Sequence, residues 1–380
     1  MSFSKLGLSA PLLKNIATQQ YEQPHAIQEL AIPAILKGKD VLGIAQTGSG
    51  KTAAFALPIL EKLQQAEQSR NRFVKVLVLV PTRELAEQVK EVFHTFSVGL
   101  PRKVKTLAVY GGVSINPQMM QLQGTDVLVA TPGRLLDLIN SKAVHLGKVE
   151  VLVLDEADKM LNLGFKEEMD KIFAMLPSKR QSILFSATLS NDVQSINEAL
   201  LRNPKVIQIE AESISPDQIN QVAYNITPEK KGPFLRYLIK QGDWQQVLVF
   251  VSSTRTADNL VDKLNKNGIQ AAAMHSKKSQ GARTSALQQF KSGKLRVLVA
   301  TDLASRGIDI EQLPHVVNYD LPRSPKDYIH RIGRTGRAGA TGKAVSLITP
   351  EDQHHFKIIQ KKMGKRVEIL ESEGIDLKGY

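Results

Sequence analysis

The strongest chemical signal in the sequence is AQTGSGKT, Ala45 to Thr52, which lies between the apolar run VLGI and the apolar segment AAFALPIL. Its glycines Gly48 and Gly50 would let backbone N–H groups wrap phosphate oxygens at a helix N-terminus. Lys51 adds a point charge, and the Thr52 hydroxyl suits magnesium. A flexible Gly/Ser turn would explain the glycines alone. Strand, Gly-Lys-Thr and helix in register instead indicate a nucleoside triphosphate site, although Ala45 stands where the general pattern has Gly.

A pair of carboxylates, Asp155 and Glu156, follows the apolar strand in VEVLVLDEAD. A carboxylate at the end of a buried parallel strand reaches the crevice above the carboxyl edge of the sheet. There Asp155 would hold magnesium, and Glu156 would orient or deprotonate an attacking water. An acidic helix start is the other explanation, since carboxylates favour the first turn. In a chain that also has a phosphate loop, the catalytic interpretation is preferred.

A basic cluster, HRIGRTGRAG, spans His330 to Gly339 and carries Arg331, Arg334 and Arg337. A solvated basic loop is the usual explanation of such a run. Arginines at a spacing of three after a helical segment would instead place two guanidinium groups on nearly one face, as a phosphate clamp needs. The second half of the chain has no Gly-Lys-Thr of its own. The sequence therefore predicts one nucleotide served by two domains, one with the phosphate loop and one with the arginines.

Short β-branched runs must position these side chains, because each is followed by a polar turn and a segment of helical period. The runs are VKVLVLV, DVLVAT, VEVLVLD, QSILFS, QVLVFV, RVLVAT and HVVNY. Continuous apolar strands alternating with helices are typical of parallel sheets covered on both faces, so the predicted fold class is α/β. Two strings recur: VLVLVPTRELAEQV at Val76 matches VLVFVSSTRTADNL at Val247, and VLVAT occurs at Val127 and Val297. This recurrence predicts two structurally similar halves.

Composition narrows the class of protein. A chain of 380 residues suits two or three domains of roughly 150 residues each. A formal charge of +13 would attract a polyanion such as nucleic acid or an anionic membrane. The absence of cysteine excludes a disulfide framework, a Cys-based zinc site and a thiol nucleophile. The N-terminal stretch is too short and broken for a signal peptide, and the apolar runs are far shorter than the roughly 20 residues that span a bilayer, so we expect a cytoplasmic protein.

Together these motifs resemble those of the DEAD-box RNA helicases of helicase superfamily 2, from about Phe3 to about Thr349. Further matches in the family's order are PTRELA (Pro81 to Ala86), GG (Gly111-Gly112), TPGR (Thr131 to Arg134), SAT (Ser186 to Thr188), ATDLASRGID (Ala300 to Asp309) and HRIGRTGR (His330 to Arg337). The stretch SQGARTSALQQFKSG is most similar to the bacterial RhlE-like branch.

The resemblance implies two tandem RecA-like domains with parallel sheets. Residues 1–29 would form the Q-motif region that reads the adenine, and residues 30–209 the N-terminal ATP-binding domain. Residues 210–220 would be a linker, because this part of the chain and the residues just before it are rich in Pro, Ser and acidic side chains. Residues 221–380 would be the C-terminal helicase domain.

The resemblance also implies where ATP binds. Tyr21 would stack on the adenine and Gln28 would pair with its edge, with Phe3 as an additional aromatic. A helix-capping Pro24 and a surface glutamine would explain the same residues. The family's hydroxyl residue after this proline is here His25, which leaves its hydrogen bond toward the phosphate loop open. The remaining residues implied to bind ATP are Ala45, Gln46, Thr47, Gly48, Ser49, Gly50, Lys51, Thr52, Gly307 and Asp309.

Roles in catalysis, coupling and RNA binding follow from the same resemblance. Glu156, Lys51, Arg334 and Arg337 would be catalytic, Thr52 and Asp155 would bind Mg²⁺, and Asp158, Ser186, Thr188 and His330 would couple hydrolysis to domain closure. The RNA backbone would be held without sequence readout by Thr82, Arg83, Gly112, Thr131, Gly133, Arg134, Arg283 and Thr301. Taken singly, most of these are better explained as helix caps or turn residues. Ser276, after His275, stands where the family commonly has Gly.

The resulting hypothesis is an ATP-dependent RNA helicase that hydrolyses ATP with Mg²⁺, unwinds short RNA duplexes and remodels RNA–protein complexes. Two alternatives stay open: a DNA translocase of the same superfamily, and an RNA clamp in which hydrolysis serves only as a timer. The DEAD tetrapeptide with Tyr21 and Gln28 favours RNA over DNA. We expect a monomer with RNA as its main partner, with ribosome-assembly or RNA-degradation proteins as further partners and without a membrane.

Overall fold

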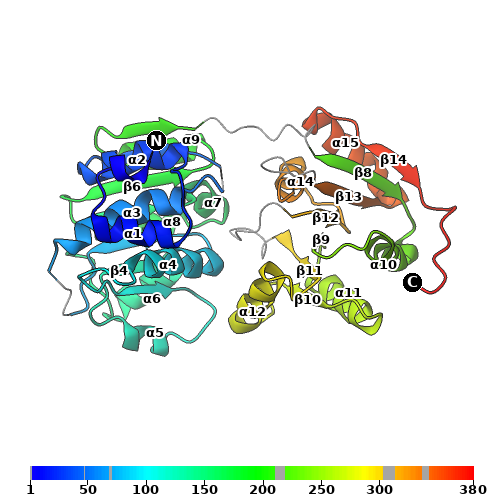
Figure 1. The fold of residues 1–380 in the computed structure, drawn as a ribbon, viewed down its shortest axis with the longest axis horizontal. Helices are drawn as coiled ribbons and strands as arrows, with labels where there is room; N and C mark the ends of the chain where they lie inside the picture. The colour runs from blue at the N-terminus through cyan, green and yellow to red at the C-terminus, as the bar shows by residue number, and fades with distance from the viewer. Residues whose placement is uncertain (1, 47, 68–70, 210–218, 303–312, 336–341) are drawn as a thin grey trace. The chain divides into compact units, whose positions relative to one another are not determined.

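Both halves of the chain form seven-stranded sheets of parallel strands flanked by helices (Figure 1). The computed structural model describes residues 2–46, 48–67, 71–209, 219–302, 313–335 and 342–380. The chain divides into two units, Met1–Ala211 and Glu212–Tyr380. Among the described residues, no helix is long and apolar enough to cross a membrane.

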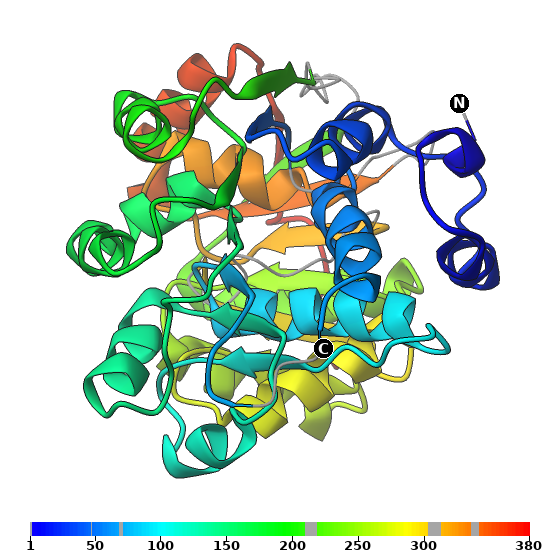
Figure 2. The same cartoon turned by 90° about the vertical axis from the view of Figure 1, so that its left-hand side faces the viewer.

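The strands of the first unit lie in the order β3-β4-β2-β5-β6-β1-β7. Figure 2 turns this unit toward the viewer. The strands are β1 (Val41–Ile44), β2 (Val76–Leu79), β3 (Thr106–Val109), β4 (Val127–Ala130), β5 (Val151–Leu154), β6 (Gln181–Ser186) and β7 (Lys205–Gln208). The helices are η1 (Phe3–Lys5), α1 (Ala10–Thr18), α2 (Ala26–Leu36), α3 (Lys51–Gln64), α4 (Arg83–Ser97), α5 (Asn116–Gln121), α6 (Pro132–Asn140), α7 (Ala157–Asn162), α8 (Lys166–Ala174) and α9 (Asn191–Leu200).

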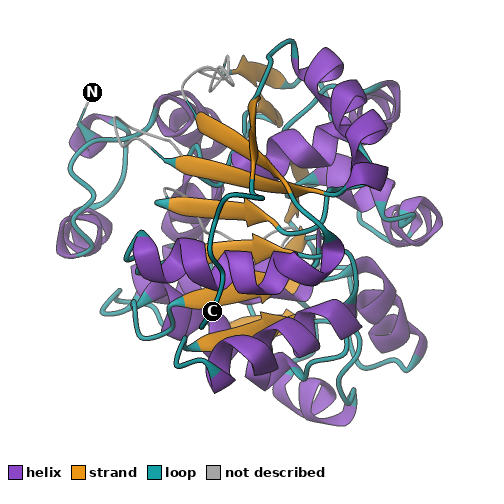
Figure 3. Ribbon diagram, turned by 90° about the vertical axis from the view of Figure 1, so that its right-hand side faces the viewer, coloured by secondary structure: helices purple, strands orange, loops and turns teal. Residues whose placement is uncertain are grey.

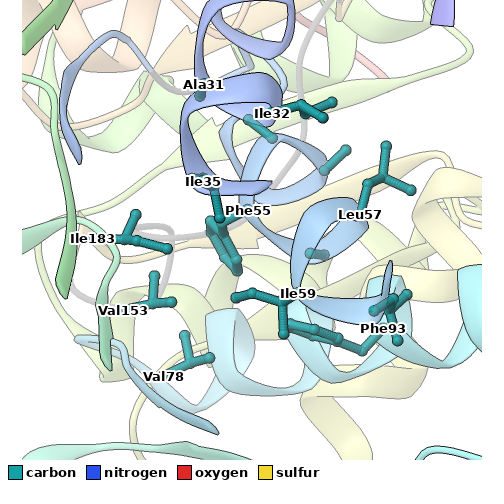
Figure 4. Packing of buried hydrophobic residues seen from close by; sticks show 14 of the residues in the cluster. Ala31, Ile32, Ile35, Phe55, Leu57, Ile59, Val78, Phe93, Val153 and Ile183 are labelled. Atoms are coloured by element: carbon teal, nitrogen blue, oxygen red, sulfur yellow. The ribbon is translucent and has the colours of Figure 1, made fainter. Parts of the chain in front are cut away.

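Side chains on the central strands alternate between two hydrophobic cores, because the sheet lies between two layers of helices. On β2, Val76 and Val78 join the core formed with α2, α3 and α4, whereas Leu77 and Leu79 join the core formed with α6 to α9. Figure 4 shows the first of these cores, in which Phe55 of α3 points toward the strand side chains. Packing on both faces fixes the strand ends, and so fixes where each following loop begins.

All six motif loops of the first unit follow the carboxyl ends of strands. Because the strands are parallel, these ends meet at one edge of the sheet. Strands β1, β5 and β6 lead to AQTGSGKT, DEAD and SAT, and they are neighbours in the sheet. Strands β2, β3 and β4 lead to PTRELA, GG and TPGR, and they are also neighbours. The predicted nucleotide residues and the predicted RNA residues therefore occupy different halves of the same edge.

The second unit has the strand order β10-β11-β9-β12-β13-β8-β14, which repeats that of the first unit position by position. Its strands are β8 (Asn220–Asn225), β9 (Val247–Phe250), β10 (Ala271–Met274), β11 (Val297–Ala300), β12 (His315–Asn318), β13 (Lys343–Ile348) and β14 (Glu368–Glu371). Its helices are η3 (Pro228–Lys230), α10 (Lys231–Gln241), α11 (Thr254–Lys266), α12 (Gln280–Lys291), α14 (Pro325–Ile332), η4 (Pro350–Asp352) and α15 (Gln353–Met363).

The recurring sequence strings lie at equivalent places in the two sheets. Strands β9 and β11 occupy the positions that β2 and β4 occupy in the first unit. In Figure 3, which shows the chain from the side of the second unit, helices lie on both sides of the strands. The predicted α/β fold with two similar halves is confirmed.

Candidate functional site

The phosphate-loop motif connects β1 to α3, and its glycines adopt backbone angles that other residues avoid. Gly48 has a φ of 82° and Gly50 a φ of 85°, in the left-handed region that glycine enters without a steric penalty. Gly50 is the N-cap of α3, so the first N–H groups of that helix face the loop. Within the loop, the Ser49 hydroxyl donates to the Gln46 carbonyl at 2.8 Å. This arrangement suits a bound phosphate. Thr47 lies outside the described residues.

Lys51 is buried at the start of α3, and its ammonium turns back into the loop. Its Nζ donates to the carbonyl oxygen of Ala45 at 2.7 Å. Burial lowers the pKa of Lys51, while the carboxylates of Asp155 and Glu156 oppose this effect. A phosphate in the loop would give the ammonium a charged partner in place of a neutral carbonyl.

Asp155 and Glu156 follow β5 and are both buried. Burial is the largest cause that raises the pKa of Asp155 to about 6, and the neighbouring Glu156 acts in the same direction while the attraction of Lys51 opposes both. Within the part of the chain that the structure describes, Asp155 Oδ1 and Glu156 Oε2 have no hydrogen-bond partner. Buried carboxylate oxygens without a donor fit a cation or an ordered water. Because Mg²⁺ is usually held by one or two protein oxygens together with substrate phosphates, Asp155 and the Thr52 hydroxyl fit that ion.

The backbone at Glu156 is strained. Its φ is 57°, a left-handed value that costs a residue with a side chain on the order of 1–3 kcal/mol. Its Oε1 accepts a hydrogen bond from Lys159 Nζ at 2.5 Å, while Oε2 stays available for a water. Lys159 did not figure among the predicted site residues, although its spacing of three residues from Glu156 on a helix start would have indicated the pair.

Gln28, at the N-terminal end of α2, connects that helix to the phosphate loop. Its Nε2 donates to the carbonyl of Gly50 at 3.1 Å, and its Oε1 accepts from the His25 backbone N–H at 2.9 Å. The Gln28 side chain is fully buried. Each end of the amide can still make one further hydrogen bond. Hydrogen bonding to an adenine nevertheless requires a local movement that exposes the Gln28 amide. The side-chain hydrogen bond from this segment to the phosphate loop therefore comes from Gln28. At position 25, where the family has a hydroxyl residue, this chain has the imidazole of His25.

Tyr21 is partly exposed, and other aromatic rings support it. Its ring lies edge-on to Phe96, with centroids 5.4 Å apart, and to Phe3, with centroids 6.5 Å apart. Phe3 is buried in the core, with only 4% of its surface exposed. The exposed face of Tyr21 can stack on a base, whereas the contacts of Phe3 are with the protein. An ATP contact by either ring stays a prediction.

The SAT motif after β6 contacts the DEAD motif after β5. The Ser186 hydroxyl donates to the Thr188 carbonyl at 2.8 Å, which folds the motif onto itself. The Thr188 hydroxyl donates to Asp158 Oδ2 at 3.4 Å. Three of the predicted coupling residues, Asp158, Ser186 and Thr188, are therefore brought together at the carboxyl ends of the neighbouring strands β5 and β6.

The loops after β2, β3 and β4 also converge. The Arg83 guanidinium packs against Gly112, whose φ is 74°, so closely that a Cβ at Gly112 would overlap it. Arg134 is buried, and its Nη2 donates to the Val113 carbonyl at 2.8 Å. Arg134 thus anchors the loop that carries Gly112. These contacts hold the loop surfaces in place, and direct RNA contact by the two arginines stays a prediction.

Thr82 and Thr131 occupy equivalent positions before helices α4 and α6. The Thr82 hydroxyl accepts from the Leu85 N–H at 3.3 Å, so the helix-cap explanation of this residue holds. Thr131 makes no such side-chain cap, and its N–H donates to the Val109 carbonyl at 3.1 Å. Gly133, in the first turn of α6, has open space where a Cβ would be. The open space beside Gly133 is compatible with a backbone phosphate.

In the second unit, Arg331 is a structural residue of the arginine motif. It is 2% exposed, and it binds both carboxylate oxygens of Asp302, with distances of 2.6 and 2.8 Å. Its Nη1 donates to Asn318 Oδ1 at 3.1 Å and to the Asp320 carbonyl at 2.6 Å. Helix α14 ends at Ile332, so the expectation that arginines three apart share one helix face is wrong for Arg331 and Arg334. Asp302, the partner of Arg331, lies in the ATDLASRGID motif but was not among the predicted site residues.

The remaining predicted residues of the second unit lie on different elements. His330 is exposed on α14, and the Arg334 carbonyl accepts from the Leu313 N–H at 3.0 Å. Thr301 follows β11, where its N–H donates to the Met274 carbonyl at 3.3 Å, and Arg283 is buried in the first turn of α12. Gly307, Asp309 and Arg337 lie outside the described residues.

The two positions that depart from the family pattern, His25 and Ser276, are both exposed. His275, before Ser276, is buried, and its Nε2 lies 3.0 Å from Asp258 Oδ1. Nothing in the structure explains the serine at position 276.

Comparison with known proteins follows the division into two units. Residues 25–196 match the DEAD/DEAH box helicase family, and residues 230–339 match the helicase conserved C-terminal domain. The ATP-dependent RNA helicase CshA of Listeria monocytogenes is 41% identical over 371 residues, which cover 97% of this chain and 70% of that protein. The DEAD-box ATP-dependent RNA helicase CshA of Bacillus subtilis is 38% identical, with 99% of this chain and 75% of that protein covered. Among solved structures, S. cerevisiae Dbp5 bound to RNA and ADP BeF3 is 32% identical with a TM-score of 0.81, covering 98% of this chain and 96% of that chain.

Proposed function

We propose, from the premise that this chain belongs to the DEAD-box family of ATP-dependent RNA helicases, that it uses ATP hydrolysis at its first sheet to unwind short RNA duplexes and remodel RNA–protein complexes. One observation carries the proposal. Lys51, Asp155 and Glu156 are buried together behind a loop whose glycines and helix N-terminus suit a triphosphate.

In this proposal the buried side chains of the first unit have distinct roles. Lys51 would hold the β- and γ-phosphates, and Thr52 and Asp155 would hold Mg²⁺, which would neutralise charge on the phosphates. Glu156 positions the attacking water through Oε2, the oxygen that has no hydrogen-bond donor in the described part of the chain. Lys159 fixes the other oxygen and so orients the carboxylate.

We propose that Arg334 and Arg337 of the second unit act on the nucleotide bound by the first unit, because the second half of the chain has no Gly-Lys-Thr motif of its own. Arg334→Ala should lower the RNA-stimulated ATPase rate by roughly 10³ or more, as expected for an arginine that stabilises a phosphoryl-transfer transition state. Arg334→Lys should restore little, since an ammonium lacks the planar fork of guanidinium. The control is Arg366→Ala, which removes an exposed arginine before β14. An Arg334→Ala protein that loses only RNA affinity would identify the cluster as an RNA-binding loop. Arg337 belongs to the same proposal.

We assign RNA binding to hydroxyl, glycine and arginine positions that suit phosphate contact without base readout. In the first unit they are Thr82, Arg83, Gly112, Thr131, Gly133 and Arg134, on loops after β2, β3 and β4. In the second unit they are Arg283 and Thr301. This assignment is supported by the separation of these loops from the phosphate loop along the sheet edge.

The competing functions predict different ATPase profiles. An RNA helicase hydrolyses ATP faster with RNA than with DNA or with neither, and it separates a short labelled duplex when ATP is present. A DNA translocase responds to single-stranded DNA instead. An RNA clamp shows RNA-stimulated hydrolysis but leaves the duplex intact, so duplex separation distinguishes it from a helicase.

Finer assignments remain part of this proposal. We place residues 1–29 in the Q-motif region, 30–209 in the ATP-binding domain, 210–220 in the linker and 221–380 in the C-terminal helicase domain. The RhlE-like branch was inferred from a single segment, whereas the curated relatives compared above carry the name CshA. A cytoplasmic location, a monomeric state, and ribosome-assembly or RNA-degradation proteins as partners stay predictions.

A further inference from the structure

The second unit contains a buried lysine at the position that the phosphate-loop lysine occupies in the first unit. Lys231 is the first residue of α10, which follows β8, just as Lys51 is the first residue of α3, which follows β1. Strands β8 and β1 occupy the same place in the two sheets. Lys231 is 6% exposed, as is Lys51. The duplicated scaffold therefore retains a cation where the first unit binds phosphate.

The surroundings of Lys231 are already filled by the protein. Its Nζ donates to the Tyr319 carbonyl at 2.8 Å and to Asp320 Oδ1 at 3.4 Å, and Asp352 Oδ2 lies 3.9 Å away. The connection before Lys231 contains Pro228 and the short helix η3 in place of a glycine loop. Lys231 thus has its anionic partners within the second unit, and the position has lost the features of a phosphate site.

Asp320 connects this lysine to an exposed turn. Its Oδ2 accepts hydrogen bonds from both the backbone N–H and the hydroxyl of Ser252, each at 2.9 Å. Its backbone carbonyl accepts from Arg331 of α14. Asp320, which follows β12, therefore joins α10, α14 and the start of the turn Ser252–Arg255. This turn comprises the end of the loop after β9 and the first two residues of α11.

The turn Ser252–Arg255 corresponds to the PTRELA turn of the first unit. It follows β9, which matches β2 in both sequence and sheet position, and the Ser253 hydroxyl caps α11 as the Thr82 hydroxyl caps α4. Ser252, Ser253 and Arg255 are exposed. The Ser253 hydroxyl and the Arg255 side chain, exposed at the carboxyl edge of the sheet, suit an RNA phosphate, whereas the Ser252 hydroxyl is already bonded to Asp320.

We propose that Asp320 is a positioning residue for RNA, which uses Lys231 as its buried anchor and fixes the turn Ser252–Arg255 so that it can hold the RNA backbone. This inference rests on the proposed function as an RNA helicase. The Asp320 carboxylate holds the turn by accepting hydrogen bonds from the backbone N–H and the hydroxyl of Ser252. Removing the charge of Asp320 therefore loosens the turn without removing a group that would touch RNA.

The test compares Asp320→Asn with Asp352→Asn. Both changes remove a carboxylate near Lys231, but only Asp320 contacts Ser252. With Asp320→Asn, the RNA concentration that gives half-maximal ATPase should rise about tenfold, the usual effect of losing one hydrogen bond to a charged group. The rate at saturating RNA and the affinity for a fluorescent ATP analogue should stay near wild type. Asp352→Asn should leave all three quantities near wild type.

Ser252 variants separate positioning from general instability. Ser252→Ala should raise the half-saturating RNA concentration in the same direction, Ser252→Thr should restore it because the hydroxyl is kept, and Ser252→Ala should add little in the Asp320→Asn background. If Asp320→Asn fails to fold, the comparison of Ser252→Ala with Ser252→Thr alone tests whether the hydroxyl that donates to Asp320 supports RNA binding. Three results would overturn the inference while the helicase function stands. The half-saturating RNA concentration of Asp320→Asn could stay near wild type, or Asp320→Asn and Asp352→Asn could raise it equally. The effects of Asp320→Asn and Ser252→Ala could also be additive in the double variant. A wild-type protein that binds no RNA would refute both.

Discussion

Replacing Asp155 by Asn should make the ligand-free protein more stable while abolishing ATP hydrolysis. Burial raises the pKa of this carboxyl to about 6 from its ordinary value of 3.8, and each pKa unit corresponds to about 1.4 kcal/mol. The ionised carboxylate therefore costs the folded state about 3 kcal/mol near neutral pH, a cost that an isosteric neutral amide avoids. For a unit of this size the melting temperature should rise by roughly 6–12 °C.

The sign of the pH dependence distinguishes this explanation from a simple packing effect. The folded protein binds the proton of Asp155 more tightly than the unfolded chain does, so the destabilisation is full above pH 6 and vanishes as the pH falls below about 4. Thermal melts followed by circular dichroism in EDTA should show the advantage of Asp155→Asn at pH 7.5 and about half of it at pH 5. Asp170→Asn, which neutralises an exposed carboxylate on α8, is the control. An Asp155→Asn protein that melts below wild type at pH 7.5, or an advantage independent of pH, would refute the reasoning.

Glu156→Gln should lower steady-state ATP turnover by about 10²–10⁴ while ATP and RNA affinities stay near wild type, because it keeps the shape and removes the group that positions water; equal losses in binding and turnover would show a structural role instead. Gly50→Ala places a Cβ at φ 85° and 2.5 Å from Gln28 Nε2, with about 1–2 kcal/mol of backbone strain added, so calorimetric ATP affinity should fall about tenfold or more while nucleotide-free RNA binding persists. RNA affinity measured by fluorescence anisotropy should fall steeply with salt, with a logarithmic slope of about −0.7 per phosphate contacted, and a flat salt dependence would contradict backbone recognition.

The fold was predictable because its signals are local. Each core strand is a short, continuous apolar run such as Val76–Leu79, and burial on both faces of a parallel sheet demands such a run. The phosphate loop was also predictable, since a glycine at φ 85° followed by Lys and a helix leaves its mark in consecutive residues. Interactions of this kind need no knowledge of the distant parts of the chain.

The contacts that were not predicted join residues far apart in the sequence. Arg331 is buried and bonded to Asp302, and the Gln28 side chain donates a hydrogen bond to the Gly50 carbonyl. Neither role can be inferred from the residue's neighbours along the chain. The spacing of the arginines was misleading because α14 ends at Ile332, one residue before a glycine cap, and helical periodicity ends there. Asp320 carried no signal at all, because its meaning depends on the equivalence of two sheets that only the strand order reveals.

The identical strand order of the two sheets has a consequence for the loops that connect the strands. A copied scaffold presents the same set of attachment points for loops, so mutations in a loop after one strand leave the register of the other strands unchanged. In the second unit, Pro228 precedes Lys231 and Asp320 contacts it, whereas the first unit has a glycine loop before Lys51, although the two sheets have the same strand order. The difference between the two sites therefore lies in the connections and not in the order of the strands. Exchange of single loops between equivalent strands is accordingly a direct route to engineering this scaffold.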